Sequence, residues 1–396
     1  MNRRGIDPVI FSCVLGLVAF GVVMIYSTSH ILALDRYGDA YYFVKRHVLW
    51  AGIGVAMMFF STRLNIRRLR GLGFPALTVS LIALALVFVP GVGRAAGGAR
   101  RWIELGFISF QPVEIAKFGL VVFLAYFLSV KGERLRDLKY GFLPPVFFTG
   151  FVLVLVLAQP DLGSAILIAL VAGMLLFVAG ARWIHLMGGA LATAPILYTM
   201  IFTVPWRQQR ILAFLDPFSV AQGTGYQLVQ SLLGLARGGI TGLGLGEGKQ
   251  KLFYLPAPHT DFIYAVVGEE VGLLGGLAVA AAFAVILYRG LGIAARSGDS
   301  FSALLAAGIT LMVSAQGLFN MSVAAGLVPT TGVPLPLISL GGTSLVMTLA
   351  ALGVLLSVAA ANQGTVRRKR RVLLDTGHPG ASRWLPRFSR VPAGGR

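Results

Sequence analysis

The stretch 261–288, DFIYAVVGEEVGLLGGLAVAAAFAVILY, decides the fold class of this chain. It is longer than the roughly 20 residues that a helix needs to cross a hydrocarbon core about 30 Å thick. Its only charged side chains are Asp261, at its start, and Glu269 and Glu270 inside it. Ionisable groups are costly in a membrane helix and usually serve a function, so these carboxylates are the first candidates for chemistry.

The rest of the chain has the same apolar character. Of its 396 residues, 56% are hydrophobic and 12% are charged, whereas soluble domains carry about a quarter charged residues. We therefore predict an all-α polytopic membrane protein with about ten transmembrane helices and a large extracytoplasmic loop, residues 204–260, between helices 7 and 8. The predicted helices cover residues 9–29, 47–61, 73–90, 112–130, 141–157, 162–180, 183–203, 261–288, 301–325 and 341–361.

The distribution of basic residues predicts the orientation. The termini and even-numbered loops hold 22 Lys and Arg, against 11 in the odd-numbered loops, which places both termini in the cytoplasm. We expect the first segment to stay uncleaved, residues 1–362 to form the membrane domain, and residues 363–396 to form a basic flexible cytoplasmic tail. The net charge is +19, and the basic residues that produce it flank the predicted helices. No nucleic-acid-binding motif accompanies them, so we expect no nucleic-acid partner.

Two further features bear on the function class. Residues 225–235 mix apolar and amide side chains and are typical of a helix at the membrane interface. No internal repeat is evident, so an inverted-repeat transporter gains no support. The single cysteine, Cys13, has no partner for a disulfide.

Polar groups gather where predicted helices begin on the outer side. Glu114 and Lys117 lie three residues apart, so they share one face of the fourth helix. Asp161 opens the sixth helix, and His259 and Asp261 open the eighth.

Each of these groups also has a structural interpretation. Glu114 and Lys117 could form a buried ion pair that only fixes helix packing. Asp161 and Asp261 could cap their helices, and His259 could be an interfacial side chain. Glu269 and Glu270 lie about 12 Å deeper than Asp261, and because they are adjacent we expect only one of them to face the bundle.

Seven motifs in order resemble the SEDS family, the FtsW/RodA peptidoglycan glycosyltransferases, across about residues 10–360. They are Gln111–Lys117, Gln159–Ser164, Asp216–Phe218, Gly225–Gln227, Leu255-Pro256, His259–Ile263 with Gly268–Glu270, and Pro334–Ser344.

Within this family the chain is more similar to the division branch, FtsW, than to the elongation branch, RodA. The residues that favour FtsW are Gln250–Leu252 and Ile263–Glu270. The chain departs from the family pattern at Ala257-Pro258, where Glu-Ala is usual, and at Leu340, where Tyr is usual. The first departure removes a carboxylate beside the expected site, and the second puts in doubt an essential hydroxyl at position 340.

The resemblance implies polymerisation of lipid II into glycan strands on the outer face of the bacterial inner membrane, at the division septum. Asp261 would be the general base for the attacking sugar hydroxyl. Lys117, paired with Glu114, would position Asp261 or meet the leaving diphosphate, and Asp161, His259 and Glu270 would support the site. Cationic stabilisation of the diphosphate would come from among Lys45, Arg46, Arg100, Arg101, Arg207 and Arg210, with a divalent cation, Mg or Mn, as a conceivable addition.

The resemblance also implies partners: a class B penicillin-binding protein that cross-links the new strand, other division-complex proteins and membrane lipids. Two other classes remain open from the residues alone. A lipid II flippase would place polar groups on both sides of the membrane midplane, whereas these motifs lie toward the outside. A scaffold that only recruits a transpeptidase would tolerate replacement of Asp261.

Overall fold

The computed structural model describes residues 6–96, 99–105, 108–251 and 255–375. Its helices are α1 Pro8–Tyr37, α2 Tyr42–Thr62, α3 Ile66–Gly71, α4 Gly73–Leu86, α5 Pro112–Lys131, α6 Leu143–Ala158, α7 Leu162–Val178, α8 Trp183–Phe202, α9 Pro205–Leu215, α10 Tyr226–Gly238, α11 Ile263–Ala295, α12 Ser300–Ala324 and α13 Gly342–Asp375. A 3₁₀ turn, η1 Gly132–Arg136, and a π turn, η2 Leu138–Phe142, join α5 to α6. The strands are β1 Gly93–Ala96, β2 Ala99–Leu105 and β3 Ile108–Phe110.

The ten predicted apolar segments all form helices. Among the described residues, eight helices are long and apolar enough to cross a membrane, and α4 and α7 are shorter apolar helices. The all-α polytopic prediction is therefore confirmed. Helix α13 runs to Asp375, into the region that the sequence predicts as a tail.

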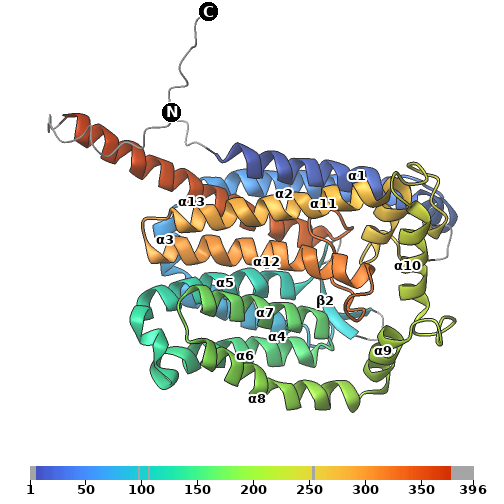
Figure 1. The fold of residues 1–396 in the computed structure, drawn as a ribbon, viewed down its shortest axis with the longest axis horizontal. Coiled ribbons are helices and arrows are strands. Elements are labelled where there is room, and N and C mark those ends of the chain that lie inside the picture. The colour runs from blue at the N-terminus through green and yellow to red at the C-terminus, as the bar shows by residue number, and fades with distance from the viewer. Residues whose placement is uncertain (1–5, 97–98, 106–107, 252–254, 376–396) are drawn as a thin grey trace, which may run out of the picture.

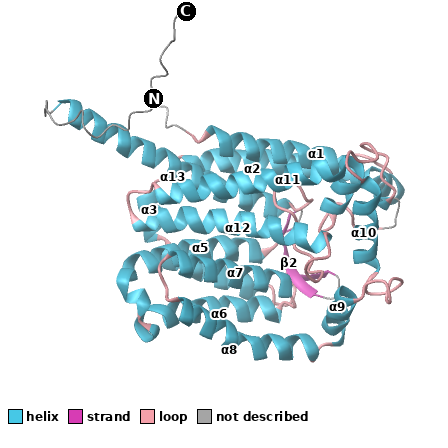
Figure 2. Cartoon of the chain, viewed as in Figure 1, coloured by secondary structure: helices cyan, strands magenta, loops and turns pink. Residues whose placement is uncertain are grey.

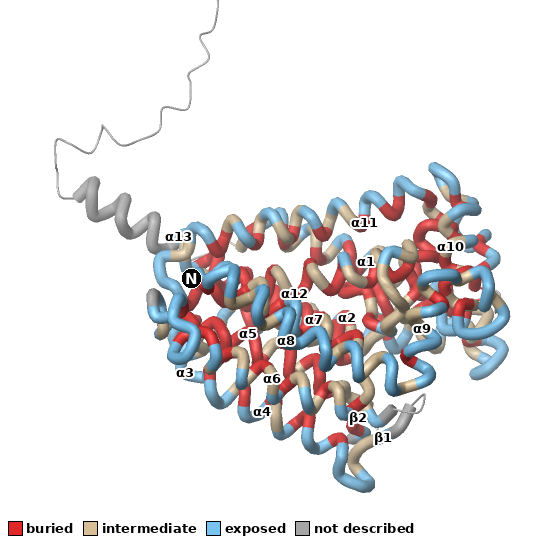
Figure 3. Tube along the Cα trace, turned by 60° about the horizontal axis from the view of Figure 1, so that its bottom comes forward, coloured by how far each residue is buried: buried red, intermediate tan, exposed pale blue. Residues whose placement is uncertain are grey.

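The long helices lie roughly side by side, with their long axes across the view of Figure 1, and α9 and α10 cross one end of the bundle. Helices α1, α2 and α11 form one side, α12, α5 and α7 the middle, and α6 and α8 the other side. Most residues of α12 are buried, whereas none of α8 is buried against the rest of the protein. Figure 3 shows the same contrast between the interior helices and the helices at the rim.

Close packing of α2 on α13 rests on small residues. A Cβ on Gly353 would lie 2.3 Å from the carbonyl oxygen of Met58, and a Cβ on Gly54 would lie 2.5 Å from a methyl carbon of Leu349. Since the hydrophobic effect does not drive association inside a bilayer, backbone approach of this kind supplies the van der Waals contact that holds the helices together.

Helix α11 is broken at Gly272, which has φ 74° and ψ −170°. The segment 239–244 lies against the break. Two of its N–H groups donate to the carbonyl oxygens of Glu269 and Glu270, both at 3.0 Å, and two N–H groups after the break donate back to it at 2.9 and 3.2 Å. The break therefore keeps its backbone hydrogen bonds, as a membrane-buried helix requires, and ties the large loop to α11.

A three-stranded antiparallel sheet, in the order β1-β2-β3, occupies residues between the predicted helices 73–90 and 112–130. In β2 and β3, Ile103 pairs with Phe110 and Leu105 with Ile108. Figure 2 shows the sheet at the same end of the bundle as α9 and α10. The predicted helix at 225–235 is confirmed as α10, whereas α9 was not predicted.

Candidate functional site

Asp261 lies directly before α11 in a half-buried position. The N-cap residue of α11 is Phe262, and no side chain caps this helix, so the capping interpretation of Asp261 is wrong. Its carboxylate instead accepts a hydrogen bond from the Thr260 hydroxyl at 2.8 Å. The side chain is thus not committed to helix structure.

The backbone around Asp261 is held by three donors from other elements. The Asn320 amide of α12 donates to the Asp261 carbonyl oxygen at 2.7 Å. The Ser339 hydroxyl donates to the Thr260 carbonyl oxygen at 2.5 Å, and the Leu340 N–H donates to the His259 carbonyl oxygen at 2.9 Å. The position of the carboxylate is consequently fixed from α12 and from the segment that precedes α13.

Arg210 acts on the charge of Asp261, and Arg101 acts in turn on Arg210. Burial raises the pKa of the Asp261 carboxyl, while the Thr260 hydrogen bond and the charge of Arg210 oppose this rise. Burial also lowers the pKa of Arg210, which interacts with both Asp261 and Arg101. Arg210 donates to the Thr330 carbonyl oxygen at 3.2 Å, and Arg101 donates to the carbonyl oxygens of Gln159 and Pro160. Backbone carbonyl oxygens therefore fix the guanidinium groups of Arg210 and Arg101, whose positive charges could neutralise an anion.

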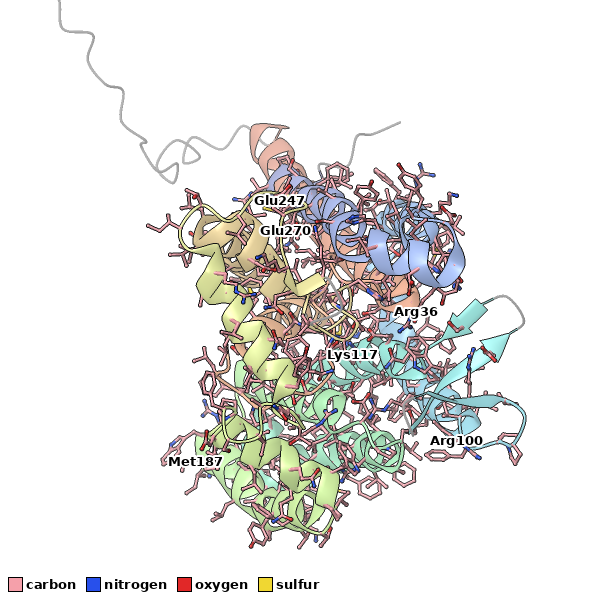
Figure 4. All side chains as sticks on the ribbon, turned by 90° about the vertical axis from the view of Figure 1, so that its right-hand side faces the viewer. Arg36, Arg100, Lys117, Met187, Glu247 and Glu270 are labelled. Atoms are coloured by element: carbon pink, nitrogen blue, oxygen red, sulfur yellow. The ribbon has the colours of Figure 1, made fainter. Side chains whose placement is uncertain are left out.

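Lys117 and Glu114 form the predicted ion pair. The Lys117 ammonium lies 2.9 Å from the Glu114 carboxylate, and each side chain is 5% exposed. Lys117 also donates to the Gln316 side-chain oxygen of α12 at 2.7 Å. Figure 4, drawn from the end that carries the sheet, shows Lys117 near the middle of this end of the bundle.

His259 is buried against the ring of Phe43, with 4.7 Å between ring centroids. Burial, together with the nearby charge of Arg36, lowers the pKa of His259 to about 4. The imidazole is therefore neutral near pH 7, and it packs as an aromatic surface beside the Asp261 segment.

The other predicted basic residues have local partners. Lys45 forms an exposed ion pair with Asp39 at 2.8 Å, and Arg46 donates to the Tyr42 hydroxyl at 2.9 Å. Arg100 is exposed on the sheet, well to the side of Lys117 (Figure 4). Arg207 is buried and donates to the Met200 carbonyl oxygen at 3.0 Å. Of the six candidates, Arg210 interacts with Asp261, and Arg101 interacts with Arg210.

Asp161 is the N-cap of α7. Its carboxylate accepts from the Ser164 N–H at 3.1 Å and from the Ser164 hydroxyl at 2.8 Å. These contacts match the capping interpretation and leave Asp161 with a structural role at the start of α7.

Glu269 and Glu270 are both buried, at 0% and 1% exposure, so the expectation that only one faces the protein interior is wrong. Glu269 accepts the N–H groups of Lys249 and Gln250 at 3.0 and 3.1 Å. Glu270 lies 2.9 Å from the Lys251 ammonium and accepts from the Ser27 hydroxyl at 2.6 Å. The large loop contacts both carboxylates, and α1 contacts Glu270 beside Lys251 of the loop. This arrangement was not evident from sequence.

Three residues of the site were not singled out as site residues from the sequence: Gln316, Asn320 and Ser339. Gln316 and Asn320 could have been found from the sequence, because they lie four residues apart in a mainly apolar helix. This spacing places both amides on one face. Buried amides are costly unless they are hydrogen-bonded, so such a pair marks a polar contact inside the bundle.

Residues 8–364 match the family model described as "Cell cycle protein", which covers FtsW, RodA and SpoVE. The chain is 44% identical over 359 residues to "Probable peptidoglycan glycosyltransferase FtsW" of Geobacter metallireducens, covering 91% of this chain and 96% of that protein. It is 38% identical over 343 residues to "Stage V sporulation protein E" of Bacillus subtilis, covering 87% and 94%.

Similar solved structures include the following two. The first, described as "Structural coordination of polymerization and crosslinking by a peptidoglycan synthase complex", has a TM-score of 0.76 and 32% identity, covering 90% of this chain and 98% of that chain. The second, the rod shape determining protein RodA of Thermus thermophilus, has a TM-score of 0.67 and 30% identity, covering 91% and 98%. Identity is higher to the FtsW relative than to RodA, which agrees with the predicted branch.

Proposed function

Because the chain belongs to the FtsW/RodA/SpoVE family of cell cycle proteins, we propose that it is a peptidoglycan glycosyltransferase. It polymerises lipid II into glycan strands at the outer face of the cytoplasmic membrane, in septal wall synthesis during cell division. The observation that carries this proposal is Asp261: a half-buried carboxylate that caps no helix, has a raised pKa, and interacts with the charge of Arg210.

The reaction joins two sugars and releases a lipid diphosphate. The 4-hydroxyl oxygen of the incoming lipid II sugar forms a bond to the anomeric carbon of the growing strand, and the bond from that carbon to the diphosphate oxygen breaks. Asp261 takes the hydroxyl proton as the new bond forms. A raised pKa makes this carboxylate a stronger base when it is ionised, which suits a general base that works near neutral pH.

The leaving diphosphate gains negative charge as its bond to the sugar breaks. Arg101 and Arg210 are held by backbone carbonyl oxygens, and Lys117 is held by Glu114 and Gln316. Donors fixed in advance stabilise developing charge without having to reorganise during the reaction. We assign these three cations to the diphosphate side of the reaction.

A divalent cation could bind at this site together with the substrate. Among the described residues, no three His, Cys, Asp or Glu side chains are placed together so that they could hold a metal ion. An ion would therefore bind through Asp261 and diphosphate oxygens of the substrate, a common arrangement for Mg²⁺. Such an ion would neutralise diphosphate charge. Polymerisation that stops with EDTA and returns with Mg²⁺ or Mn²⁺ would support this assignment, and unchanged rates in EDTA would contradict it.

Polymer formation in detergent micelles separates the proposed activity from its alternatives. Purified protein is mixed with lipid II in micelles, which have no second leaflet, and the products are resolved by chain length. A glycosyltransferase forms long strands under these conditions, whereas a flippase or a scaffold leaves the lipid II unpolymerised. The partner transpeptidase is included with its acylation site blocked by a β-lactam, because activation by the partner is part of the expectation.

The orientation follows from the charge distribution, and we propose that both termini lie in the cytoplasm. With Cys13 replaced by Ser, a single cysteine at exposed Glu247 should react with an impermeant maleimide on intact spheroplasts. A single cysteine at exposed Arg136 should react only after the cells are broken. The reverse pattern would place the Asp261 end of the bundle in the cytoplasm and contradict the proposed function.

We also propose a class B penicillin-binding protein as partner. A similar structure belongs to a complex described as coordinating polymerization and crosslinking. Affinity purification of this chain from its native membranes should retain a transpeptidase that labels with fluorescent penicillin. Its repeated absence, with the chain itself intact and folded, would contradict the partnership.

A further inference from the structure

Two buried amides of α12, Gln316 and Asn320, lie one helical turn apart on the side of α12 that faces the site. They are 3% and 1% exposed. Most neighbouring residues of α12 are apolar, so each amide carries a cost that its hydrogen bonds must offset. Their partners show what they do.

Gln316 links Lys117 to the chain segment before α13. Its side-chain oxygen accepts from the Lys117 ammonium at 2.7 Å. Its amide nitrogen donates to the Pro334 carbonyl oxygen at 3.0 Å. One side chain therefore connects the buried cation to this segment.

Asn320 makes the corresponding link for Asp261. Its amide nitrogen donates to the Asp261 carbonyl oxygen at 2.7 Å and to the Val333 carbonyl oxygen at 2.8 Å. A Cβ placed on Gly332 would lie 3.8 Å from a carboxylate oxygen of Asp261. The same segment that Gln316 holds therefore runs past the Asp261 side chain.

The segment 330–334 is irregular rather than helical. Gly332 has a φ of 76°, and proline at 334 disfavours helical geometry for Val333 before it. The carbonyl oxygens of the segment therefore lack regular partners and accept from side chains instead. Arg210 is a third such donor, to Thr330 at 3.2 Å. Arg210 thus binds this five-residue segment directly, whereas Lys117 is linked to it through Gln316 and Asp261 through Asn320.

We propose that Gln316 and Asn320 are positioning residues that set the placement of Asp261 relative to Lys117 during glycan polymerisation. The inference rests on the proposed function. Neither amide acts on the substrate. Each acts through a catalytic group, and the 330–334 segment joins the two.

The test compares Asn320→Leu and Gln316→Met with Ser314→Ala as the matched control. The first two changes keep side-chain volume and remove the hydrogen bonds. Ser314 lies on the same helix, is buried, and has a hydroxyl without a hydrogen-bond partner in the described residues. We expect kcat for polymerisation to fall about 10- to 100-fold in the first two variants, since a displacement of about 1 Å costs this much. KM for lipid II should stay within about twofold, and the control should match the parent protein.

Variants of Ser339 test the same inference if Asn320→Leu or Gln316→Met does not fold. Ser339→Ala removes the donor to the Thr260 carbonyl oxygen and is a small change. It should lower kcat in the same way, and Ser339→Thr, which keeps the hydroxyl, should restore it. If these residues served only folding, their replacement would lower thermal stability but would not lower kcat while leaving KM unchanged.

Two results overturn the inference. One is a kcat within twofold of the parent in folded Asn320→Leu, Gln316→Met and Ser339→Ala. The other is an equal loss in the Ser314→Ala control. A parent protein that forms no polymer would instead overturn the proposed function, and the inference with it.

Discussion

Replacing Asp261 with Asn is expected to reduce the polymerisation rate by about 10²- to 10⁴-fold, the usual contribution of a general base. The amide keeps the shape of the carboxylate and can still accept from the Thr260 hydroxyl, but it cannot take the hydroxyl proton of the sugar. Because Asp261 does not cap α11, folding should change little. Strand formation from lipid II by purified protein, at matched folded concentration, measures the loss.

A matched control is available in Asp299→Asn. Asp299 caps α12, where its carboxylate accepts from the Ser302 N–H at 3.0 Å, and Asn caps a helix about as well as Asp. This variant should polymerise at the parent rate. Asp261→Asn activity within a few-fold of the parent would remove Asp261 from the reaction and favour the scaffold interpretation.

Replacing Lys117 with Met is the second change with a large expected effect. It removes one partner of a pair in which both side chains are 5% exposed, and leaving a buried charge unpaired costs about 3–5 kcal/mol in stability. It also removes a cation that we assign to the leaving diphosphate. Loss of one such donor lowers rates by about 10²- to 10³-fold. Thermal melting and strand formation, measured on the same preparation, report the two effects.

The double variant Lys117→Met with Glu114→Gln separates these effects. Neutralising Glu114 removes the uncompensated charge, so stability should recover toward that of the parent protein. Polymerisation should stay at the level of the single variant, because the cation is still missing. Recovery of activity together with stability would mean that the ion pair serves only helix packing.

Much of the fold follows from the sequence because the bilayer permits few choices. Segments such as 112–130 and 301–325 are long and apolar, and only helices can satisfy the backbone of such segments in lipid. Glu114 and Lys117 were predicted to share a face because three residues separate them. The spacing within one helix fixes that pairing without information about any neighbouring helix.

What the sequence could not reveal depends on contacts between distant segments. The pairing of Glu270 with Lys251 and Ser27 requires the large loop and α1 to meet α11. The break at Gly272 is stable because segment 239–244 supplies hydrogen-bond partners. Arg101 and Arg210 could not be distinguished from Lys45 and Arg46, since the sequence predicts an outer-side position for all four. Only the three-dimensional positions show that Arg210 interacts with Asp261 and that Arg101 interacts with Arg210.

The pH dependence of polymerisation, measured for the parent and for Asp261→Asn, tests most directly that Asp261 is the base. Burial raises the pKa of this carboxyl above its ordinary value of 3.8. The parent rate should therefore fall as pH decreases through that raised value, since protonated Asp261 cannot accept a proton. The residual rate of Asp261→Asn should lack this acid limb. An acid limb that persists unchanged in Asp261→Asn would show that another group is the base and would contradict the account.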